Sequence, residues 1–222
     1  MGDRLPAPEV HLHFARLDVP PDEVERFTCL LSPDEIDRAN RYYHDRDRRR
    51  FLVARGRLRE LLGEYVGIEP EKIVFFYSER GKPSIGDSPH FNVSHSGEMA
   101  FYGFARGRRV GVDVERVRSL SDLSGLTKRF FCAKEHELIE NHPERERVFF
   151  QLWTAKEAYL KAIGTGIAGG LNRVEVSIDP LQLENVGGDW NVYTYRPDGD
   201  YFATAAIEGN GYEVKTFGLS AI

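Results

Sequence analysis

The chain has few cysteines and no long apolar run. Its 222 residues contain two cysteines, Cys29 and Cys132, which lie far apart and lack the spacing of a metal site. We therefore expect free thiols rather than a disulfide framework. No apolar stretch approaches the roughly 20 residues that a membrane-spanning helix needs, and no apolar signal segment follows the first residues. These absences predict a cytoplasmic protein that does not enter a membrane.

The chain also lacks an excess of positive charge. Its 30 Lys and Arg against 35 Asp and Glu give a net charge of −5, which gives no support to general nucleic-acid binding. The basic residues are unevenly placed, however, and a dense arginine run on an acidic protein indicates an anionic partner, although a solvated helix face is its usual meaning. The run comprises Arg38, Arg41, Arg46, Arg48, Arg49, Arg50, Arg55, Arg57 and Arg59.

The order of the expected elements predicts an α+β fold in two halves. A chain of 222 residues, 41% of them hydrophobic, can form one large domain or two small ones. Helices followed by strands occur twice, and the change falls near 107–118. We therefore expect an N-terminal α+β half over 1–108 and a C-terminal α+β half over 109–222, which form one functional unit.

Capping signals, helical periodicity and strand alternation place the individual elements. Ser32-Pro33-Asp34-Glu35 is a capping box with proline at the first helical position, so a helix begins there. Other helices are expected from about residue 20 and over 47–66, 123–131, 134–141 and 144–163. Strands are expected over 10–15, 73–77, 91–96, 99–105, 110–115, 174–178, 190–195, 201–207 and 213–217.

The stretch 149–166 predicts an unusual helix. At about 100° per residue its apolar residues share one arc, and Lys156 falls near the middle of that arc. A buried ammonium needs an anion from the protein or from a ligand; the alternative is a lysine that snorkels from a core helix. Trp153, Glu157 and Lys161 follow one another at i, i+4 and i+8, so they stack along the edge of the arc.

Two carboxylates share one face of an expected strand. Asp113 and Glu115 lie at i and i+2, so both leave the same side of the strand. Carboxylates this close repel each other unless a cation lies between them. Oxygen ligation favours Mg²⁺ or Mn²⁺ over zinc, and Glu157 of the long helix could supply a third oxygen. An exposed polar strand face is the alternative.

A basic turn precedes these strands. It consists of Arg80, Gly81, Lys82 and Pro83. Glycine lets the backbone come close to a ligand and proline fixes the chain that follows, although most such sequences are merely turns.

The strand 91–96 carries four polar residues. Asn92, Ser94 and Ser96 share one side, and His95 lies on the other. A Ser–His catalytic pair is not expected, because neighbouring strand residues point apart and no nucleophile elbow surrounds them. A single strand histidine is more often structural than functional.

Taken in order, the segments RGKP, FNVSHS, GVDVE and FFQLWTAKEAYLKAIGTG resemble the motifs of the 4′-phosphopantetheinyl transferases, in particular the larger surfactin-synthetase-activating, two-lobed type. These motifs span 80–166, and length and element order fit the family over essentially the whole chain. The resemblance implies two similar α+β halves related by a pseudo-twofold axis, with the active site in the cleft between them. It also implies a Mg²⁺-dependent transfer of 4′-phosphopantetheine from coenzyme A to a serine of an apo acyl or peptidyl carrier protein, with release of adenosine 3′,5′-bisphosphate.

The resemblance assigns roles to the acidic residues and to the long helix. Asp113, Glu115 and Glu157 look like the metal ligands, and Glu157 also resembles the candidate general base for the carrier serine. A carboxylate shared with a metal is a weak base, so a metal-bound water is the alternative. Lys161 would stabilise charge on the departing pyrophosphate, which makes Glu157 and Lys161 the expected catalytic residues. Trp153 matches the family tryptophan and is expected to pack.

The resemblance further implies a set of coenzyme A contacts. Arg38 and Arg50 look similar to basic residues near the adenosine and its 3′-phosphate, and Lys156 would find its anion on the coenzyme. Some members carry a second basic residue three positions before Arg38, where this chain has Glu35, the capping partner of the helix start. The full set is Arg38, Arg50, Arg80, Gly81, Lys82, Pro83, Asn92, Ser94, His95, Lys156 and Lys161.

Rival functions and partners stay open from the sequence. The surplus arginines would attract the acidic helix of a carrier protein, and a non-catalytic module that binds carriers or nucleotides is one alternative. A Mg²⁺-dependent phosphohydrolase acting on coenzyme A is another. The chain is too long for a small trimeric carrier-protein synthase of the same superfamily, so we expect a monomer. Fatty acid, polyketide, nonribosomal peptide and glycolipid pathways all remain open.

Overall fold

The computed structural model describes residues 5–6, 8–86, 89–166 and 170–218. The expected halves, 1–108 and 109–222, therefore include residues outside the described ranges. Within those ranges, no helix is both long enough and apolar enough to cross a membrane.

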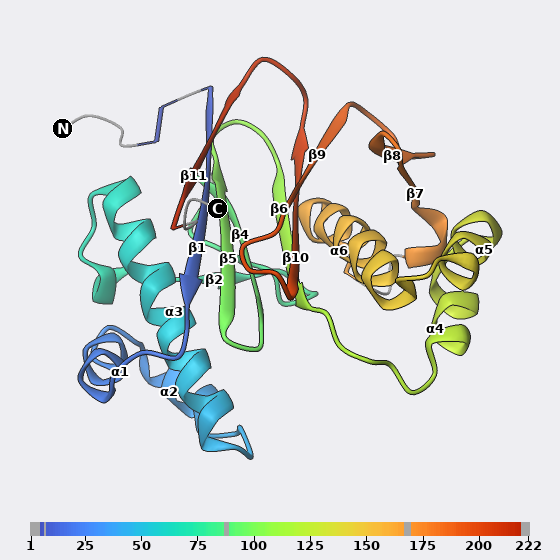
Figure 1. Cartoon of the computed structure of the whole chain (residues 1–222). Helices are drawn as coiled ribbons and strands as arrows, with labels where there is room; N and C mark the ends of the chain where they lie inside the picture. The colour runs from blue at the N-terminus through green and yellow to red at the C-terminus, as the bar shows by residue number, and fades with distance from the viewer. Residues whose placement is uncertain (1–4, 7, 87–88, 167–169, 219–222) are drawn as a thin grey trace.

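Six α-helices and two short 3₁₀ helices are present in the described ranges (Figure 1). The α-helices are α1 (Pro21–Thr28), α2 (Pro33–Ala39), α3 (Asp45–Val66), α4 (Leu123–Phe130), α5 (Ala133–Asn141) and α6 (Arg145–Ile163). The 3₁₀ helices are η1 (Pro70–Lys72) and η3 (Leu171–Arg173). The strands are β1 (Glu9–Arg16), β2 (Phe76–Tyr77), β3 (Pro83–Ser84), β4 (His90–Ser96), β5 (Met99–Ala105), β6 (Val110–Arg116), β7 (Glu175–Ile178), β8 (Leu181–Glu184), β9 (Trp190–Tyr195), β10 (Tyr201–Glu208) and β11 (Glu213–Phe217).

The helix ends follow the local signals in the sequence. The capping box at the start of α2 is confirmed, because the backbone N–H of Ser32 donates to the Glu35 carboxylate over 3.0 Å. Helices α3 and α6 end at Gly67 and Gly164, where φ is 71° and 76°. Glycine adopts this left-handed conformation without the steric cost that a Cβ would add.

Two sheets form the centre of the molecule. The first has the order β11-β1-β5-β4, and the second has the order β6-β10-β9. Strand β11 pairs with β1 in parallel, whereas the other pairings in these two sheets are antiparallel. Strand β6 of the second sheet lies within the predicted boundary region 107–118, and the last strand, β11, pairs in the first sheet. The division into two halves stays a prediction.

The elements stack in four layers, with α1–α3 outside the first sheet and α4–α6 outside the second (Figure 1). The two sheets pack face to face through a buried apolar cluster that includes Leu12 and Phe101 from one and Val112 and Ala203 from the other. Since burying each large apolar side chain contributes roughly 1.5–3 kcal/mol, this interface joins the halves firmly. The α+β fold class is as predicted.

Strand β6 lies directly against helix α6 because it carries a glycine there. A Cβ on Gly111 would come within 2.1 Å of the carbonyl oxygen of Ala158 and 2.4 Å of the nitrogen of Ala162. Any larger residue would push helix and strand apart. This close approach brings the second half of α6 alongside the residues that follow Gly111 in β6.

The predicted strand over 73–77 is shorter than expected. Only Phe76–Tyr77 forms a strand, and it pairs with Pro83–Ser84 in a small separate sheet. Strand β8 was also not predicted from the sequence; it pairs with β7. Short strands of this kind have too few residues for alternation to be recognised.

Candidate active site

Asp113 lies at the meeting point of β4, β6 and α6. Its carboxylate is buried, with 3% of the residue exposed. The oxygen Oδ1 accepts hydrogen bonds from Ser94 Oγ at 2.8 Å and from Lys161 Nζ at 2.6 Å. The other oxygen, Oδ2, is buried and has no hydrogen-bond partner among the described residues. Side chains from both halves of the chain therefore meet at this carboxylate.

Glu115 follows two residues later on the same face of β6. Its carboxylate accepts hydrogen bonds from Ser96 Oγ at 2.8 Å and from Arg118 Nη1 at 3.1 Å. Burial and the negative charge of Asp113 raise the pKa of Glu115. The predicted shared face of Asp113 and Glu115 thus faces Ser94 and Ser96 of β4.

Glu157 reaches the same region from α6. It is buried, and its Oε1 has no hydrogen-bond partner in the described chain. Burial, followed by the charge of Asp113 and more weakly that of Glu115, raises the pKa of Glu157 to about 7, while Lys161 opposes the rise. The charge of Asp113 therefore raises the pKa of both Glu115 and Glu157.

The predicted metal centre would lie among these three carboxylates. Among the residues that the structure describes, no group of three or more His, Cys, Asp or Glu side chains is arranged to hold a metal ion. The assignment of Asp113, Glu115 and Glu157 as metal ligands stays a prediction. What the structure adds is the two buried oxygens without partners, one on Asp113 and one on Glu157.

Lys161 supplies positive charge to this acidic cluster. Its Nζ donates to Ser94 Oγ at 2.9 Å as well as to Asp113. Its side chain is 27% exposed, whereas that of Asp113 is 4% exposed. The ammonium therefore lies at the boundary between the buried carboxylates and solvent.

The prediction that Lys156 contacts coenzyme A is corrected by the structure. Its side chain is fully buried, and Nζ forms an ion pair with Glu135 of α5 and donates to the carbonyl oxygen of Leu171 at 3.1 Å. Glu135 also accepts from the backbone N–H groups of Val176 at 2.8 Å and Cys132 at 2.9 Å. The anion that the apolar arc required comes from the protein. Burial lowers the pKa of Lys156, and Glu135 opposes that shift.

The basic turn at 80–83 holds the end of α6. Lys82 Nζ donates to the carbonyl oxygens of Lys161 at 2.7 Å and Ala162 at 3.0 Å, and Arg80 Nη1 donates to that of Thr165 at 2.6 Å. Gly81 has a φ of 78°, which a side chain would disfavour. Burial and nearby Arg109 lower the pKa of Lys82. The turn connects the two halves, and its predicted contacts with coenzyme A remain predictions.

The polar residues of β4 divide between the two faces of the strand. Asn92, Ser94 and Ser96 all turn toward β6, where Asn92 Oδ1 accepts from the backbone N–H of Val112 at 2.9 Å. His95 lines a pocket on the other face. Desolvation and the charges of Lys161 and Arg38 lower the pKa of His95.

Two adjoining pockets are both lined by Arg38 and Tyr77, and His95 lines the narrower of them. The narrower has a volume of about 190 Å³, and the wider has a volume of about 510 Å³. The narrower is lined by Arg38, Phe51, Ala54, Arg55, Leu58, Tyr77, Gly81, Pro83, Val93 and His95. The wider is lined by Asp34, Arg38, Arg41, Tyr42 and Tyr77.

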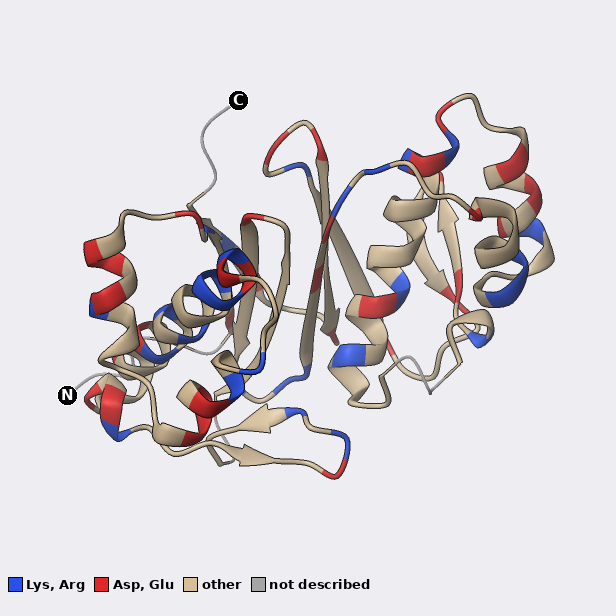
Figure 2. Ribbon diagram, turned by 90° about the horizontal axis from the view of Figure 1, so that it is seen from below, with Lys and Arg blue, Asp and Glu red and all other residues tan. Residues whose placement is uncertain are grey.

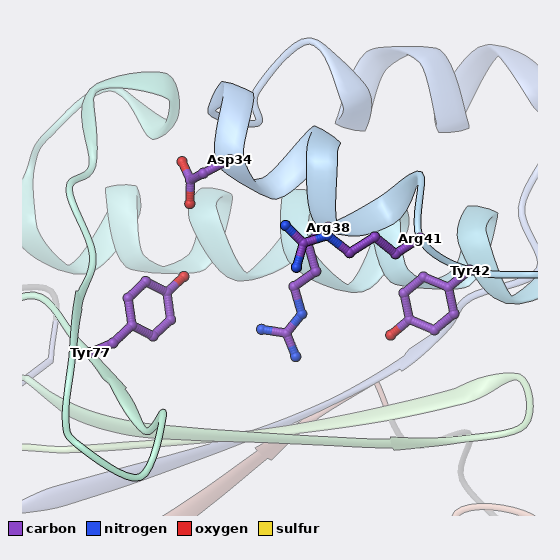
Figure 3. A pocket seen from close by; sticks show the side chains of 5 residues that line it. All are labelled: Asp34, Arg38, Arg41, Tyr42 and Tyr77. Carbon is purple, nitrogen blue, oxygen red and sulfur yellow. The ribbon is translucent and has the colours of Figure 1, made fainter.

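The wider pocket is basic and flanked by aromatic rings. In Figure 3 the guanidinium groups of Arg38 and Arg41 lie between the rings of Tyr42 and Tyr77. Neither arginine side chain forms a hydrogen bond or an ion pair with a residue that the structure describes. Asp34 is the acidic residue of the lining, and it accepts a hydrogen bond from Ser32 Oγ. Unpaired cations beside aromatic faces are suited to a nucleotide phosphate.

Arg50 lies apart from these pockets. It donates two hydrogen bonds, of 2.7 and 2.6 Å, to the carboxylate of Asp18, and it lines neither pocket. The predicted nucleotide contact of Arg50 therefore stays a prediction, without support from the lining of either pocket. Arg41, Arg55 and Tyr77 line the pockets instead, and the arginine run was the available signal for two of them.

Trp153 packs as expected. Its ring stacks on Phe149 at a centroid distance of 5.5 Å and contacts Phe130 edge-on at 5.5 Å.

Glu135 is a residue that the sequence-based prediction missed. The signal for it was the spacing Cys132-Ala133-Lys134-Glu135, which forms a capping box at the start of α5.

Comparisons with known proteins show which family the chain resembles. The model of the 4′-phosphopantetheinyl transferase superfamily matches residues 109–206, and that of the 4′-phosphopantetheinyl transferase N-terminal region matches residues 20–103. The chain is 41% identical to the 4′-phosphopantetheinyl transferase HetI of Nostoc sp., over 93% of this chain and 91% of that protein. It is 39% identical to a putative 4′-phosphopantetheinyl transferase of Synechocystis sp., over 87% and 76% of the two chains. Similarity to the 4′-phosphopantetheinyl transferase Sfp of Bacillus subtilis is 30% identity over 81% and 83%.

Proposed function

The chain belongs to the 4′-phosphopantetheinyl transferase superfamily, and we propose that it transfers the 4′-phosphopantetheine group of coenzyme A to a serine of an apo acyl or peptidyl carrier protein. The second product is adenosine 3′,5′-bisphosphate. The observation that carries the proposal is the junction of the family motifs. Ser94 from β4, Asp113 from β6 and Lys161 from α6 lie within hydrogen-bond distance of one another.

The transfer exchanges a phosphoanhydride bond of coenzyme A for a phosphate ester bond on the carrier serine. The serine oxygen attacks the phosphorus that carries the pantetheine group, and the bond from that phosphorus to the bridging diphosphate oxygen breaks. Negative charge then develops on the departing nucleotide, where a positioned cation lowers the barrier. Lys161 lies at the solvent boundary of the acidic cluster, which suits it to bind that charge.

The serine hydroxyl must also lose its proton. A general base works best when its pKa lies near the operating pH. Without a metal ion, the raised pKa of Glu157, about 7, and its buried Oε1, which has no partner in the described chain, support this residue as the proton acceptor. Holding a metal ion would weaken Glu157 as a base, so its two predicted roles compete.

The acidic cluster fits a hard divalent cation in its donor chemistry. Carboxylate oxygens are the ligands that Mg²⁺ and Mn²⁺ prefer, and two buried oxygens in the cluster have no partner in the described chain. Asp113, Glu115 and Glu157 would hold the ion, which would supply positive charge for the diphosphate.

The two adjoining pockets would hold the nucleotide end of coenzyme A. Arg38 and Arg41 offer guanidinium groups that form no ion pair with a described residue, and Tyr42 and Tyr77 offer aromatic faces. Lys82 has three ammonium hydrogens and two acceptors on α6, which leaves one donor for a coenzyme phosphate.

The start of α3 is the surface that we propose for the carrier protein. Figure 2 shows basic and acidic segments interleaved over the helices of the first half. Arg46, Arg48 and Arg49 lie at the surface and pair with Asp45 or Asp47. Such exposed pairs are weak and exchange readily, so an acidic carrier helix can compete for these arginines.

Mass spectrometry tests the proposed reaction. An apo carrier protein is incubated with the enzyme, coenzyme A and Mg²⁺, and we expect the carrier to gain the mass of one phosphopantetheine group. Binding without a mass gain would indicate a non-catalytic binding module. Free phosphopantetheine with an unmodified carrier would indicate a phosphohydrolase. Carriers from fatty acid, polyketide, nonribosomal peptide and glycolipid pathways, tested in parallel, would identify the natural partner.

A further inference from the structure

The narrower pocket is lined by a guanidinium group that the wider pocket lacks. Arg55 of α3 lines it together with Arg38 and His95. The side chain of Arg55 is 10% exposed, and its Nη1 makes no hydrogen bond with a described residue, although Nε and Nη2 both do. One donor of this arginine is therefore left for the pocket.

Three neighbouring residues hold Arg55 in place. Its Nε donates to Glu35 Oε1, and its Nη2 donates to the hydroxyl oxygen of Tyr77 at 2.6 Å. Its guanidinium carbon also lies 3.9 Å from the centre of the Phe75 ring. A guanidinium restrained on three sides has lost its rotamer freedom before any ligand binds.

Glu35 does not make this pocket acidic. The residue is 2% exposed, and it is shared between Arg55 and Arg59, whose Nε donates to Oε2 at 2.7 Å. Burial would raise the pKa of Glu35, but Arg55, the backbone of Ser32 and Arg59 together lower it. The buried group of one carboxylate and two guanidiniums therefore carries a net positive charge, and Arg55 is the member that lines the pocket.

We propose that Arg55 binds the 3′-phosphate of coenzyme A, with Glu35 and Tyr77 as its positioning residues. Glu35 of α2 accepts from Arg55 of α3, and Arg55 supplies the cation that lines the pocket. The inference rests on the proposed function, because it assumes coenzyme A as the substrate.

The geometry of β4 favours the 3′-phosphate over the diphosphate. Ser94 faces Asp113 and Lys161, whereas His95 faces the pocket of Arg55. Coenzyme A carries a diphosphate on one side of its ribose and a monophosphate on the other. If the diphosphate lies beside Lys161, the monophosphate is the anion that remains for the pocket.

The test compares coenzyme A with dephospho-coenzyme A, which lacks only the 3′-phosphate. Isothermal titration calorimetry on the full chain gives the affinity for each ligand, and the wild type should bind coenzyme A more tightly. In Arg55→Met the affinity ratio should fall about tenfold, because coenzyme A binding weakens and dephospho-coenzyme A binding does not. Tyr77→Phe should lower the ratio less, by about threefold, since Arg55 loses one restraint.

Arg59→Met is the matched control. Arg59 shares Glu35 with Arg55 but donates its other hydrogen bonds to the carbonyl oxygens of Pro70 and Ile73, and it lines neither pocket. Its loss should leave the affinity ratio unchanged. If Arg55→Met does not fold, the exposed Tyr77 provides the decisive variant.

Three outcomes would overturn the inference. The wild type could bind both ligands equally, the ratio could stay unchanged in Arg55→Met and Tyr77→Phe, or both ligands could weaken equally in Arg55→Met. The last result would place Arg55 at the diphosphate or in the pocket wall. Each applies while the wild type labels a carrier protein; failure of that labelling would instead contradict the proposed function.

Discussion

Lys156 and Glu157 are neighbours on α6, but they differ in whether their buried polar atoms have partners within the described chain. Lys156 is buried beside Glu135, and that carboxylate also accepts two backbone hydrogen bonds. Glu157 is buried as well, but its Oε1 has no partner in the described chain, and the nearby Asp113 Oδ2 has none either. Successive helical residues point about 100° apart, so Lys156 points toward Glu135 of α5 and Glu157 points toward the cluster of Asp113 and Lys161.

The difference separates a structural ion pair from a candidate functional cluster. A buried charge whose ion-pair and hydrogen-bond partners are all present is compensated within the protein. A buried charge that lacks partners costs stability, and proteins retain such groups mainly where a ligand or a reaction needs them. By this criterion Lys156 belongs to the framework of α6, whereas Glu157 belongs to the chemistry.

Lys156→Met is the strongest way to break the comparison. The substitution keeps an apolar chain of similar length but leaves Glu135 buried without its cation, which should destabilise the protein by about 3–5 kcal/mol. Chemical denaturation monitored by circular dichroism measures the change. Lys128 is exposed, so Lys128→Met should change stability by less than about 0.5 kcal/mol. If Lys156→Met kept full stability and lost coenzyme A binding, Lys156 would be a ligand contact after all.

Glu157→Gln should have the opposite effect on stability. The pKa of Glu157 is about 7 in the folded protein against an ordinary value of 4.5, so the folded state binds this proton more tightly than the unfolded state does. Stability is therefore full below about pH 4.5 and falls as the pH rises toward 7. At about 1.4 kcal/mol per pKa unit, the wild type loses about 3 kcal/mol that the glutamine variant keeps.

Denaturation at pH 5 and pH 8, in buffer containing a chelator, measures this gain. The same variant should transfer phosphopantetheine about 10²–10⁴-fold more slowly, as expected for loss of a general base. Equal stability of both proteins at pH 8 would contradict the inference that ionised Glu157 destabilises the folded protein. Normal carrier labelling would remove Glu157 from the mechanism.

Local sequence signals predicted much of this arrangement. The alternation over 110–115 placed Asp113 and Glu115 on one strand face, and both now accept hydrogen bonds from serines of β4. The capping box at Ser32 and the glycine at the end of α6 marked helix ends that the structure confirms. These features depend on residues a few positions apart, so the chain encodes them locally.

The partners of buried charges could not be predicted in the same way. Periodicity placed Lys156 in an apolar arc, but its anion lies on α5, 21 residues earlier in the chain. The return of β11 to the first sheet is likewise a pairing between distant segments. Such choices depend on how helices and sheets pack, which a single sequence does not display.

Gly111→Ala tests the comparison by changing the distance between the backbones of β6 and α6. The added methyl group would overlap the carbonyl oxygen of Ala158, so α6 must move away from β6, at a cost of about 1–3 kcal/mol. The Lys156–Glu135 pair should move with the helix, whereas the contact of Lys161 with Asp113 should lengthen. We therefore expect transfer activity to fall more than stability alone explains. Ala100→Gly, in a neighbouring strand, provides a comparable change in stability away from this contact; equal activity of both variants would contradict the expectation.

Lys82→Met should have the smallest effect. It tests a residue that we assign both to the framework of α6 and to coenzyme A binding. Lys82 is bonded to two carbonyl oxygens at the end of α6, as a framework residue would be, yet we propose that its remaining donor binds a coenzyme phosphate. Loss of the cation from a helix C-terminus should cost about 1 kcal/mol of stability, and the affinity for coenzyme A should fall about threefold to tenfold. Lys72→Met, which removes an exposed lysine paired with Glu69, should change neither. A stability loss with unchanged coenzyme A affinity would assign Lys82 to the framework alone, because the helix end would then account for every contact that this ammonium makes.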